Sequence, residues 1–373
     1  MITRFAGAIA TALTASLGLA SSALAAPKVA VDIAPVHALV ARVMEGVGEP
    51  ALIIPPEATP HAYSLRPSEA SALERADMVV WIGAELTPWL EGSIDTLAGD
   101  AHVIPLLGAG GSSMREFREG LAFAAAEPEN EDHGEGHEHD AHGHEDHAHD
   151  DHAHDDHGHE EHEHEHEEHG HDDHGHEEHA QKEHGHDAHA EHAHDHGHAH
   201  DGADPHAWLD PANARAWLEV IATELAEHDP ENAARYEANA TAAAEELAVL
   251  EDSIAAQLAP VQGVPYVVYH DAYQYFEARF GVSPTGALSL GDAADPGPAR
   301  VAALRDLARD KGIVCVFGEP QFGGERIASI FGDTVGHGVL DPLGSSHTPG
   351  PDLYDAVLTD MADALAGCLS AES

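Results

Sequence analysis

The chain has 373 residues, and its 68 aspartates and glutamates outnumber its 16 lysines and arginines, which gives a formal net charge of −52. So strong a negative charge repels phosphate backbones and excludes nucleic acid as a partner. It favours the attraction of cations instead.

Residues 1–25 have the features of a secretory signal peptide. Arg4 gives a positive start, an apolar run extends from Ala6 to Ala20, and Ala23-Leu24-Ala25 forms an A-x-A cleavage site. The apolar run is too short to anchor the chain in a membrane, and no cysteine lies at the cleavage site to carry a lipid. We therefore expect cleavage before Ala26 and a soluble periplasmic protein.

Two blocks of short Val/Ile-rich runs alternate with helical patterns. In the first block the expected strands are Val29–Ile33, Leu52–Ile54, Met78–Ile82 and Val103–Leu106, and the expected helices include Pro35–Gly46 and Pro67–Ala76. In the second block the expected strands are Tyr266–Tyr269, Ile313–Phe317 and Val335–Leu340, and the expected helices are Ala272–Phe280, Ala299–Asp310, Glu325–Phe331 and Asp352–Leu369. The alternation predicts an α/β fold with two domains, residues 26–229 and 260–373, each built on a mostly parallel sheet.

Residues 127–203 form a low-complexity insertion in the first domain. It contains 27 of the 35 histidines, between His133 and His200, and no Leu, Ile, Val or Phe. Because it cannot bury enough apolar surface to offset its ordering entropy, we predict that it is disordered.

The insertion repeats the pattern His-x-His, which places two imidazoles on one side of an extended chain. Examples are the pairs His142 and His144, His147 and His149, and His162 and His164. Neutral imidazoles bind Zn²⁺, Cu²⁺ and Ni²⁺ alike, so such pairs are not selective. We interpret the insertion as an auxiliary low-affinity metal collector; a solvating acidic spacer is the alternative.

An Ala-rich stretch from Pro230 to Leu258 has a helical pattern. Asp229 suits the N-cap and Pro230 the first helical position. The apolar residues of its second half lie on one helical stripe: Leu247, Leu250, Ile254 and Leu258. We predict that residues 230–259 form a helix, roughly 42 Å long, and one interpretation is that it links the two domains. A surface helix packed within one domain is the alternative.

The two cysteines, Cys315 and Cys368, have the even count expected of a disulfide in an oxidising compartment. Cys315 lies in a buried-strand pattern, and Cys368 lies on the predicted last helix. A disulfide would attach that helix to the sheet and stabilise the fold by about 3–4 kcal/mol. Two buried free thiols are the alternative.

Three histidines lie where ligands gather in α/β proteins. His61 follows the strand Leu52–Ile54, His206 lies in the motif Asp204–Pro211, and His270 ends the strand that begins at Tyr266. Ligands of open α/β sheets bind beyond the carboxyl ends of strands, so His61 and His270 could meet between the domains. Taken singly, each histidine is explained better by a structural role.

Three imidazole nitrogens suit Zn²⁺, but they leave its charge uncompensated, so a carboxylate or hydroxide is a natural fourth ligand. Asp341 ends the strand Val335–Leu340 and is a candidate for this position. The alternative is that Asp341 forms the turn before Pro342.

Around these residues the chain resembles the zinc-binding proteins of bacterial zinc ABC importers, the ZnuA-like branch of the cluster A-I solute-binding family. The resemblance covers nearly all of the mature chain outside the insertion. Its motifs are His61–Ser68, Asp204–Pro211, His270–Phe276, Gly318–Phe322 and Leu340–Gly344. It implies two (β/α) domains with four-stranded sheets, joined by a rigid helix, with Zn²⁺ in the interdomain cleft.

The resemblance also implies the ligands His61, His206 and His270 and a disulfide between Cys315 and Cys368. The manganese-binding branch has Glu at the position of His270, and imidazole there favours zinc. Some zinc-binding members have Glu immediately before the first ligand, where this chain has Pro60. The fourth position therefore falls to water or to Asp341, and we favour water with Asp341 behind the ligands.

For function, the resemblance implies high-affinity capture of Zn²⁺ by a periplasmic monomer. The ion would pass to an inner-membrane ABC permease driven by a cytoplasmic ATPase, and periplasmic metallochaperones are further expected partners. We expect no enzymatic activity.

Two other functions use the same residues. A zinc hydrolase would activate a water on the three histidines, with Glu319 as general base, although a structural acid at a strand end explains Glu319 better. A metal buffer would act through the His-rich insertion alone.

Overall fold

The computed structural model describes residues 26–118, 120, 122–123, 202–289, 296–322, 327, 330–332 and 335–370. The predicted signal peptide, the paired histidines from His142 to His164, and most of the predicted helix Glu325–Phe331 lie outside these residues. Within the described part of the chain, no helix is both long and apolar enough to cross a bilayer.

The first sheet has the strand order β2-β1-β3-β4, and all its neighbouring strands are parallel. The strands are β1 (Val29–Val31), β2 (Ala51–Leu52), β3 (Met78–Trp81) and β4 (His102–Pro105). They are connected by α1 (Ala34–Val43), α2 (Pro67–Glu74) and α3 (Pro88–Leu97). The two central strands are buried along their whole length, which is why they read as continuous apolar runs.

The second sheet has the order β6-β5-β7-β8 and is also parallel throughout. Its strands are β5 (Tyr266–His270), β6 (Gly286–Ser289), β7 (Cys315–Gly318) and β8 (Gly336–Val339). Its helices are α6 (Gln274–Phe280), α7 (Pro298–Lys311) and α9 (Leu353–Ser370). Two four-stranded parallel sheets with their helices confirm the predicted two-domain α/β fold.

Side chains alternate between the two faces of β5. Tyr266 and Val268 belong to the large core cluster that also includes the first sheet. Val267 and Tyr269 belong to a smaller cluster with Leu304 of α7. Because the period of a strand is two residues, His270 follows Tyr266 and Val268 onto the face that carries the large cluster.

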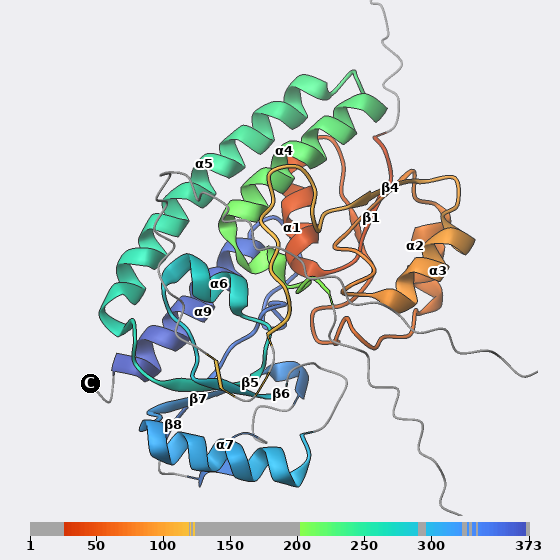
Figure 1. Ribbon diagram of the computed structural model, residues 1–373. Helices are drawn as coiled ribbons and strands as arrows, with labels where there is room; N and C mark the ends of the chain where they lie inside the picture. Colours follow the sequence, from red (N-terminus) through yellow and green to blue (C-terminus); the bar gives the residue numbers. More distant parts are fainter. Residues whose placement is uncertain are drawn as a thin grey trace, which may run out of the picture. The chain divides into compact units, whose positions relative to one another are not determined.

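The longest helix, α5 (Ala233–Leu258), lies beside α4 (Pro211–His228) in Figure 1. It also contacts α1, which follows the first strand, and α9, which ends the described chain. Helix α5 starts later than predicted, with Asn232 as its N-cap. Asp229 does not cap it: this buried carboxylate accepts hydrogen bonds from Asn232 Nδ2 (2.7 Å) and the Tyr236 hydroxyl (2.9 Å) and ties the α4–α5 turn together. The domain boundaries inferred around this helix remain predictions.

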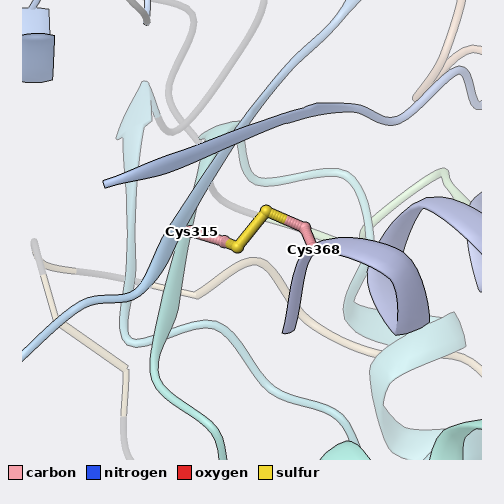
Figure 2. Close-up of a disulfide and its surroundings, with 2 residues drawn as sticks. All are labelled: Cys315 and Cys368. Carbon is pink, nitrogen blue, oxygen red and sulfur yellow. A yellow bond between two sulfur atoms is a disulfide. The ribbon is translucent and has the colours of Figure 1, made fainter. Parts of the chain in front are cut away.

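A disulfide joins Cys315 on β7 to Cys368 on α9 (Figure 2). It attaches the last helix to the second sheet, as predicted. Gly336 is the β8 partner of Cys315, and a Cβ added there would lie 2.9 Å from both sulfur atoms. The disulfide therefore requires glycine at this position of β8.

Candidate metal site

Three histidines that are far apart in the sequence lie together in the structure. His61 belongs to the loop between β2 and α2, His206 precedes the short 3-10 helix η1 (Ala207–Leu209), and His270 is the last residue of β5. The ring centroids are 5.5 Å apart for His61 and His206, 6.2 Å for His61 and His270, and 5.0 Å for His206 and His270. Among the described residues this is the one group of at least three His, Cys, Asp or Glu side chains whose donor atoms all lie within 4.8 Å of one another.

The three rings line a cavity of about 10 Å³, about the space of a single water molecule. His206 and His270 are 2% and 3% exposed, whereas His61 is only partly buried. Apolar residues such as Trp208 and Phe322 also line the cavity, together with the polar residues Thr59, Glu319 and Gln321. The cavity thus suits an ion, and His61 is the ligand candidate nearest to solvent.

Asp204 orients the ring of His206. Its Oδ1 accepts the main-chain N–H of His206 (3.0 Å) and lies 2.7 Å from Nδ1 of the same ring. Because the carboxylate acts as acceptor, Nδ1 carries the proton, and Nε2 keeps the lone pair that a metal needs. Gln274 Nε2 donates to the other oxygen of Asp204 (3.0 Å), so the orienting carboxylate is itself held in place.

Glu319 has the same relation to His270. This carboxylate is 2% exposed, and its Oε1 lies 3.2 Å from His270 Nδ1. Burial, followed by the charge and hydrogen bonding of Glu319, raises the pKa of Tyr273 well above its ordinary value. The Tyr273 hydroxyl therefore stays protonated beside Glu319, and it donates to the Leu340 carbonyl at 3.5 Å.

The loop that carries His61 is anchored on both sides of the histidine. Trp89 Nε1 donates to the Pro60 carbonyl (2.7 Å). On the other side, the Tyr63 hydroxyl donates to Glu69 (2.9 Å), and the Tyr63 ring contacts that of Trp89 at 6.0 Å between centroids. His61 thus lies on an exposed loop but in a defined position.

The donor set matches the requirements of Zn²⁺. A tetrahedral ion with Zn–N distances of about 2.0–2.1 Å holds its donors roughly 3.3 Å apart. Because no two donors are more than 4.8 Å apart, the widest pair must close by at most roughly 1.5 Å. Asp204 and Glu319, each one hydrogen bond from a candidate ligand, supply two negative charges to balance the ion. Sequence reasoning did not assign these orienting roles, although the position of Asp204 two residues before His206 is a readable signal.

Asp341, the candidate fourth ligand, contacts the turn that it begins. Its Oδ1 accepts a hydrogen bond from the Gly344 amide (3.0 Å). Its Oδ2 accepts hydrogen bonds from the Ser345 amide (2.6 Å) and the Ser345 hydroxyl (2.7 Å). Gln321, which lines the cavity, donates to Oδ1 at 3.1 Å. These contacts favour a supporting role through Gln321 over direct ligation.

The other described histidines do not line the cavity. His37 contacts the Pro50 carbonyl (3.1 Å), and His347 pairs with Asp360 (2.7 Å). The remaining ones are His102, His228 and His337.

The chain matches known proteins along nearly its whole length. A family model described as zinc-uptake complex component A, periplasmic, matches residues 29–368. The high-affinity zinc uptake system protein ZnuA of Paracoccus denitrificans (strain Pd 1222) is 43% identical over 364 residues, which cover 96% of this chain and 98% of the relative.

Two solved structures support the fold. A crystal structure of ZnuA has a TM-score of 0.62 at 20% identity and covers 92% of this chain and 99% of its own. A crystal structure of a 138–173 deletion mutant of ZnuA with zinc bound has a TM-score of 0.62 at 19% identity, over 92% and 98% of the two chains. At these identities the comparison supports the fold alone.

Proposed function

This chain belongs to the ZnuA family of periplasmic zinc-uptake components, and we propose that it captures Zn²⁺ through His61, His206 and His270 and delivers the ion to an ABC-type zinc importer. The observation that carries the proposal is the cluster of three imidazoles, two buried and one partly buried, with donor atoms within 4.8 Å of one another. Hydrogen bonding by Asp204 and Glu319 turns two of the rings so that Nε2 can bind the ion.

The fourth position of the ion is taken by water, with Asp341 behind the ligands. Both oxygens of Asp341 accept hydrogen bonds from its own turn, so ligation would break contacts that already exist. A site with three protein ligands and one exchangeable water suits a protein that must release its ion.

A buried three-histidine site with a water also occurs in hydrolases, but the carboxylates here argue for a binding protein. Glu319 accepts a hydrogen bond from His270, and Asp204 accepts from His206. Each is engaged in orienting a ligand and is poorly placed to serve as a general base. The cavity of about 10 Å³ has room for an ion but not for an organic substrate.

The remaining parts of the proposal concern location and partners. Residues 1–25 direct export, and the mature chain acts as a soluble periplasmic monomer. Its partners are the inner-membrane permease with its cytoplasmic ATPase, and periplasmic metallochaperones that supply zinc. The His-rich insertion collects metal at low affinity, through pairs such as His142 and His144.

The test is a zinc titration of four single variants and one triple variant against a chromophoric chelator. Each of His61→Ala, His206→Ala and His270→Ala should weaken the tight site at least a hundredfold, because a two-ligand site remains. His347→Ala, whose ring pairs with Asp360 outside the cavity, is the matched control and should change nothing. If a triple variant at the three positions keeps one tight equivalent, the metal-buffer alternative is correct and the proposed site is wrong.

Delivery is tested separately from capture. Bacteria that lack their own zinc-uptake binding protein should regain growth under zinc limitation with the wild-type chain and not with His206→Ala. Growth with neither chain, despite tight binding in the titration, would refute delivery while leaving capture intact.

A further inference from the structure

An arginine outside the cavity holds two buried carboxylates together. Arg118 follows the first sheet in the chain, and its Nε donates to Asp271 (3.1 Å) while its Nη1 donates to Glu277 (2.5 Å). Asp271 and Glu277 are 3% and 2% exposed. The guanidinium carbon also lies 3.9 Å from the centroid of the Phe123 ring. Arg118 is thus the cation of a buried cluster with Asp271, which directly follows β5, and Glu277 of α6.

Asp271 links this cluster to the candidate ligand His270. The two residues are consecutive, and the turn they form is closed by a hydrogen bond from the Ala272 amide to the His270 carbonyl (3.1 Å). The Asp271 amide donates to the Ser289 carbonyl of β6 (3.1 Å). The main chain at His270 is therefore held by β6 on one side and, through the Asp271 carboxylate, by Arg118 on the other.

The segment that carries Arg118 also reaches the second candidate ligand. We define the stem as residues 115–118, which precede the insertion, and residues 202–204, which include its last residues and Asp204. Within it, the Asp204 amide donates to the Arg115 carbonyl (2.8 Å), and Glu116 forms an antiparallel bridge with Ala203.

Helix α6 fastens the stem to the second sheet. The Tyr275 hydroxyl accepts from the Arg115 amide (2.8 Å) and donates to the Asp204 carbonyl (2.8 Å). Gln274 Nε2 donates to the Glu116 carbonyl (2.9 Å) as well as to Asp204 Oδ2 (3.0 Å). The same α6 side chains therefore hold both halves of the stem and the carboxylate that orients His206.

We propose that Arg118 is a positioning residue for the metal site, and that the stem of the His-rich insertion is part of the structure that sets its zinc affinity. Arg118 fixes the main chain of His270 through Asp271, and the stem fixes His206 through Asp204. The inference rests on the proposed function, because it assumes that these histidines bind Zn²⁺. If the proposal is correct, the chain segments on the two sides of the insertion support the two most buried candidate ligands, His206 and His270.

The first variant is Arg118→Gln, studied in the full chain. Changing a residue that supports a ligand weakens metal binding by about 10–100-fold, and Arg118 acts one residue away from His270, so we expect a loss of about tenfold. Arg118→Lys keeps the charge beside Asp271 and should recover most of this loss. Bound Co²⁺ should show a changed visible spectrum in Arg118→Gln and a near-normal one in Arg118→Lys, because the spectrum reports the geometry of the ligands.

A matched control separates positioning from general stability. Arg42 is 11% exposed and bonds Asp355 (2.7 Å) at the contact of α1 with α9, far from the stem in the sequence. Arg42→Gln should lower the melting temperature of the metal-free protein as Arg118→Gln does, and leave zinc affinity unchanged.

A double variant removes the charge imbalance. Arg118→Gln with Glu277→Gln deletes one positive and one negative charge, so the net charge of the cluster is unchanged while the contact with Asp271 is lost. It should be more stable than Arg118→Gln alone and still bind zinc about tenfold more weakly than the wild type. It also serves as the test if Arg118→Gln alone does not fold.

The outcomes distinguish the two proposals. Wild-type affinity in folded Arg118→Gln and in the Arg118→Gln/Glu277→Gln double variant, or an equal loss of affinity in Arg42→Gln, would overturn the positioning role and leave the zinc site intact. Absence of a tight site in the wild type, or its survival in His206→Ala, would instead overturn the proposed function.

Discussion

Asp204→Asn is the sharpest test of how the site is organised. The substitution preserves shape but removes the charge that accepts Nδ1–H of His206 at 2.7 Å. It also weakens the bond to the His206 amide, which Asp204 Oδ1 accepts at 3.0 Å. Because Asp204 is 1% exposed, water cannot replace either contact.

The expected magnitude follows from the geometry. The Asp204 carboxylate would lie roughly 6.5 Å from an ion on Nε2, and at an effective dielectric constant of about 20 its attraction to a 2+ charge is at most about 5 kcal/mol. Relaxation and solvent screening reduce this, and comparable substitutions beside metal-binding histidines cost 10–100-fold in affinity, or about 1.4–2.7 kcal/mol. We expect Asp204→Asn to fall in this range. Glu319→Gln should cost less, because its contact with His270 is longer, 3.2 Å.

The assay is competition with a chelator of similar affinity, so that only the tight site is read. Glu224→Gln is the control, since Glu224 pairs with His102 at 2.8 Å in the same carboxylate–histidine arrangement away from the cavity. It should leave zinc affinity unchanged. An Asp204→Asn protein with native circular dichroism and an affinity within twofold of the wild type would refute the orienting role.

Three further predictions concern other parts of the molecule. Deleting His133–His200 should leave one tight zinc equivalent and remove the weak ones in a calorimetric titration; loss of the tight equivalent would show that the insertion contributes ligands. Replacing Cys315 and Cys368 by serine should lower the free energy of unfolding by about 4 kcal/mol, because the bond closes a loop of 53 residues; an unchanged denaturation midpoint would contradict this. Burial raises the pKa of Asp32 to about 7, so its stabilising contribution is present near pH 4 and is lost as the pH rises through 7. Relative to Asp32→Asn, the metal-free wild type should therefore lose about 2 kcal/mol between pH 5 and 7 in denaturant titrations. Parallel pH profiles of the two proteins would argue against a buried Asp32 carboxyl with a raised pKa.

Sequence patterns identified the helices and strands whose buried positions hold large apolar residues. Strands such as β3 are covered on both faces and read as Met78-Val79-Val80-Trp81. Strand β6 was missed because Gly286-Ala287-Leu288-Ser289 has one large apolar side chain, although all four residues are buried. Helix α4 was also missed, despite the N-cap Asp210, whose Oδ1 accepts the Ala212 amide (2.8 Å), and despite an apolar stripe that includes Trp217. Its signals were local and readable.

The contacts of the metal site also divide into those that the sequence could predict and those that it could not. Asp204 lies two residues from His206, so its orienting role could have been read from the chain. Glu319 is 49 residues from His270, and no spacing rule connects them. They meet because β7 lies next to β5 in the sheet, which brings the residue after β7 beside the last residue of β5. The order of strands in a sheet depends on how helices and sheets pack over the whole chain. It can therefore bring together strand ends that are far apart in the sequence, and no local sequence pattern predicts this. Asp271 and Arg118, 153 residues apart, depend on that packing as well, and this is why the positioning contacts of the metal site emerge only from the three-dimensional structure.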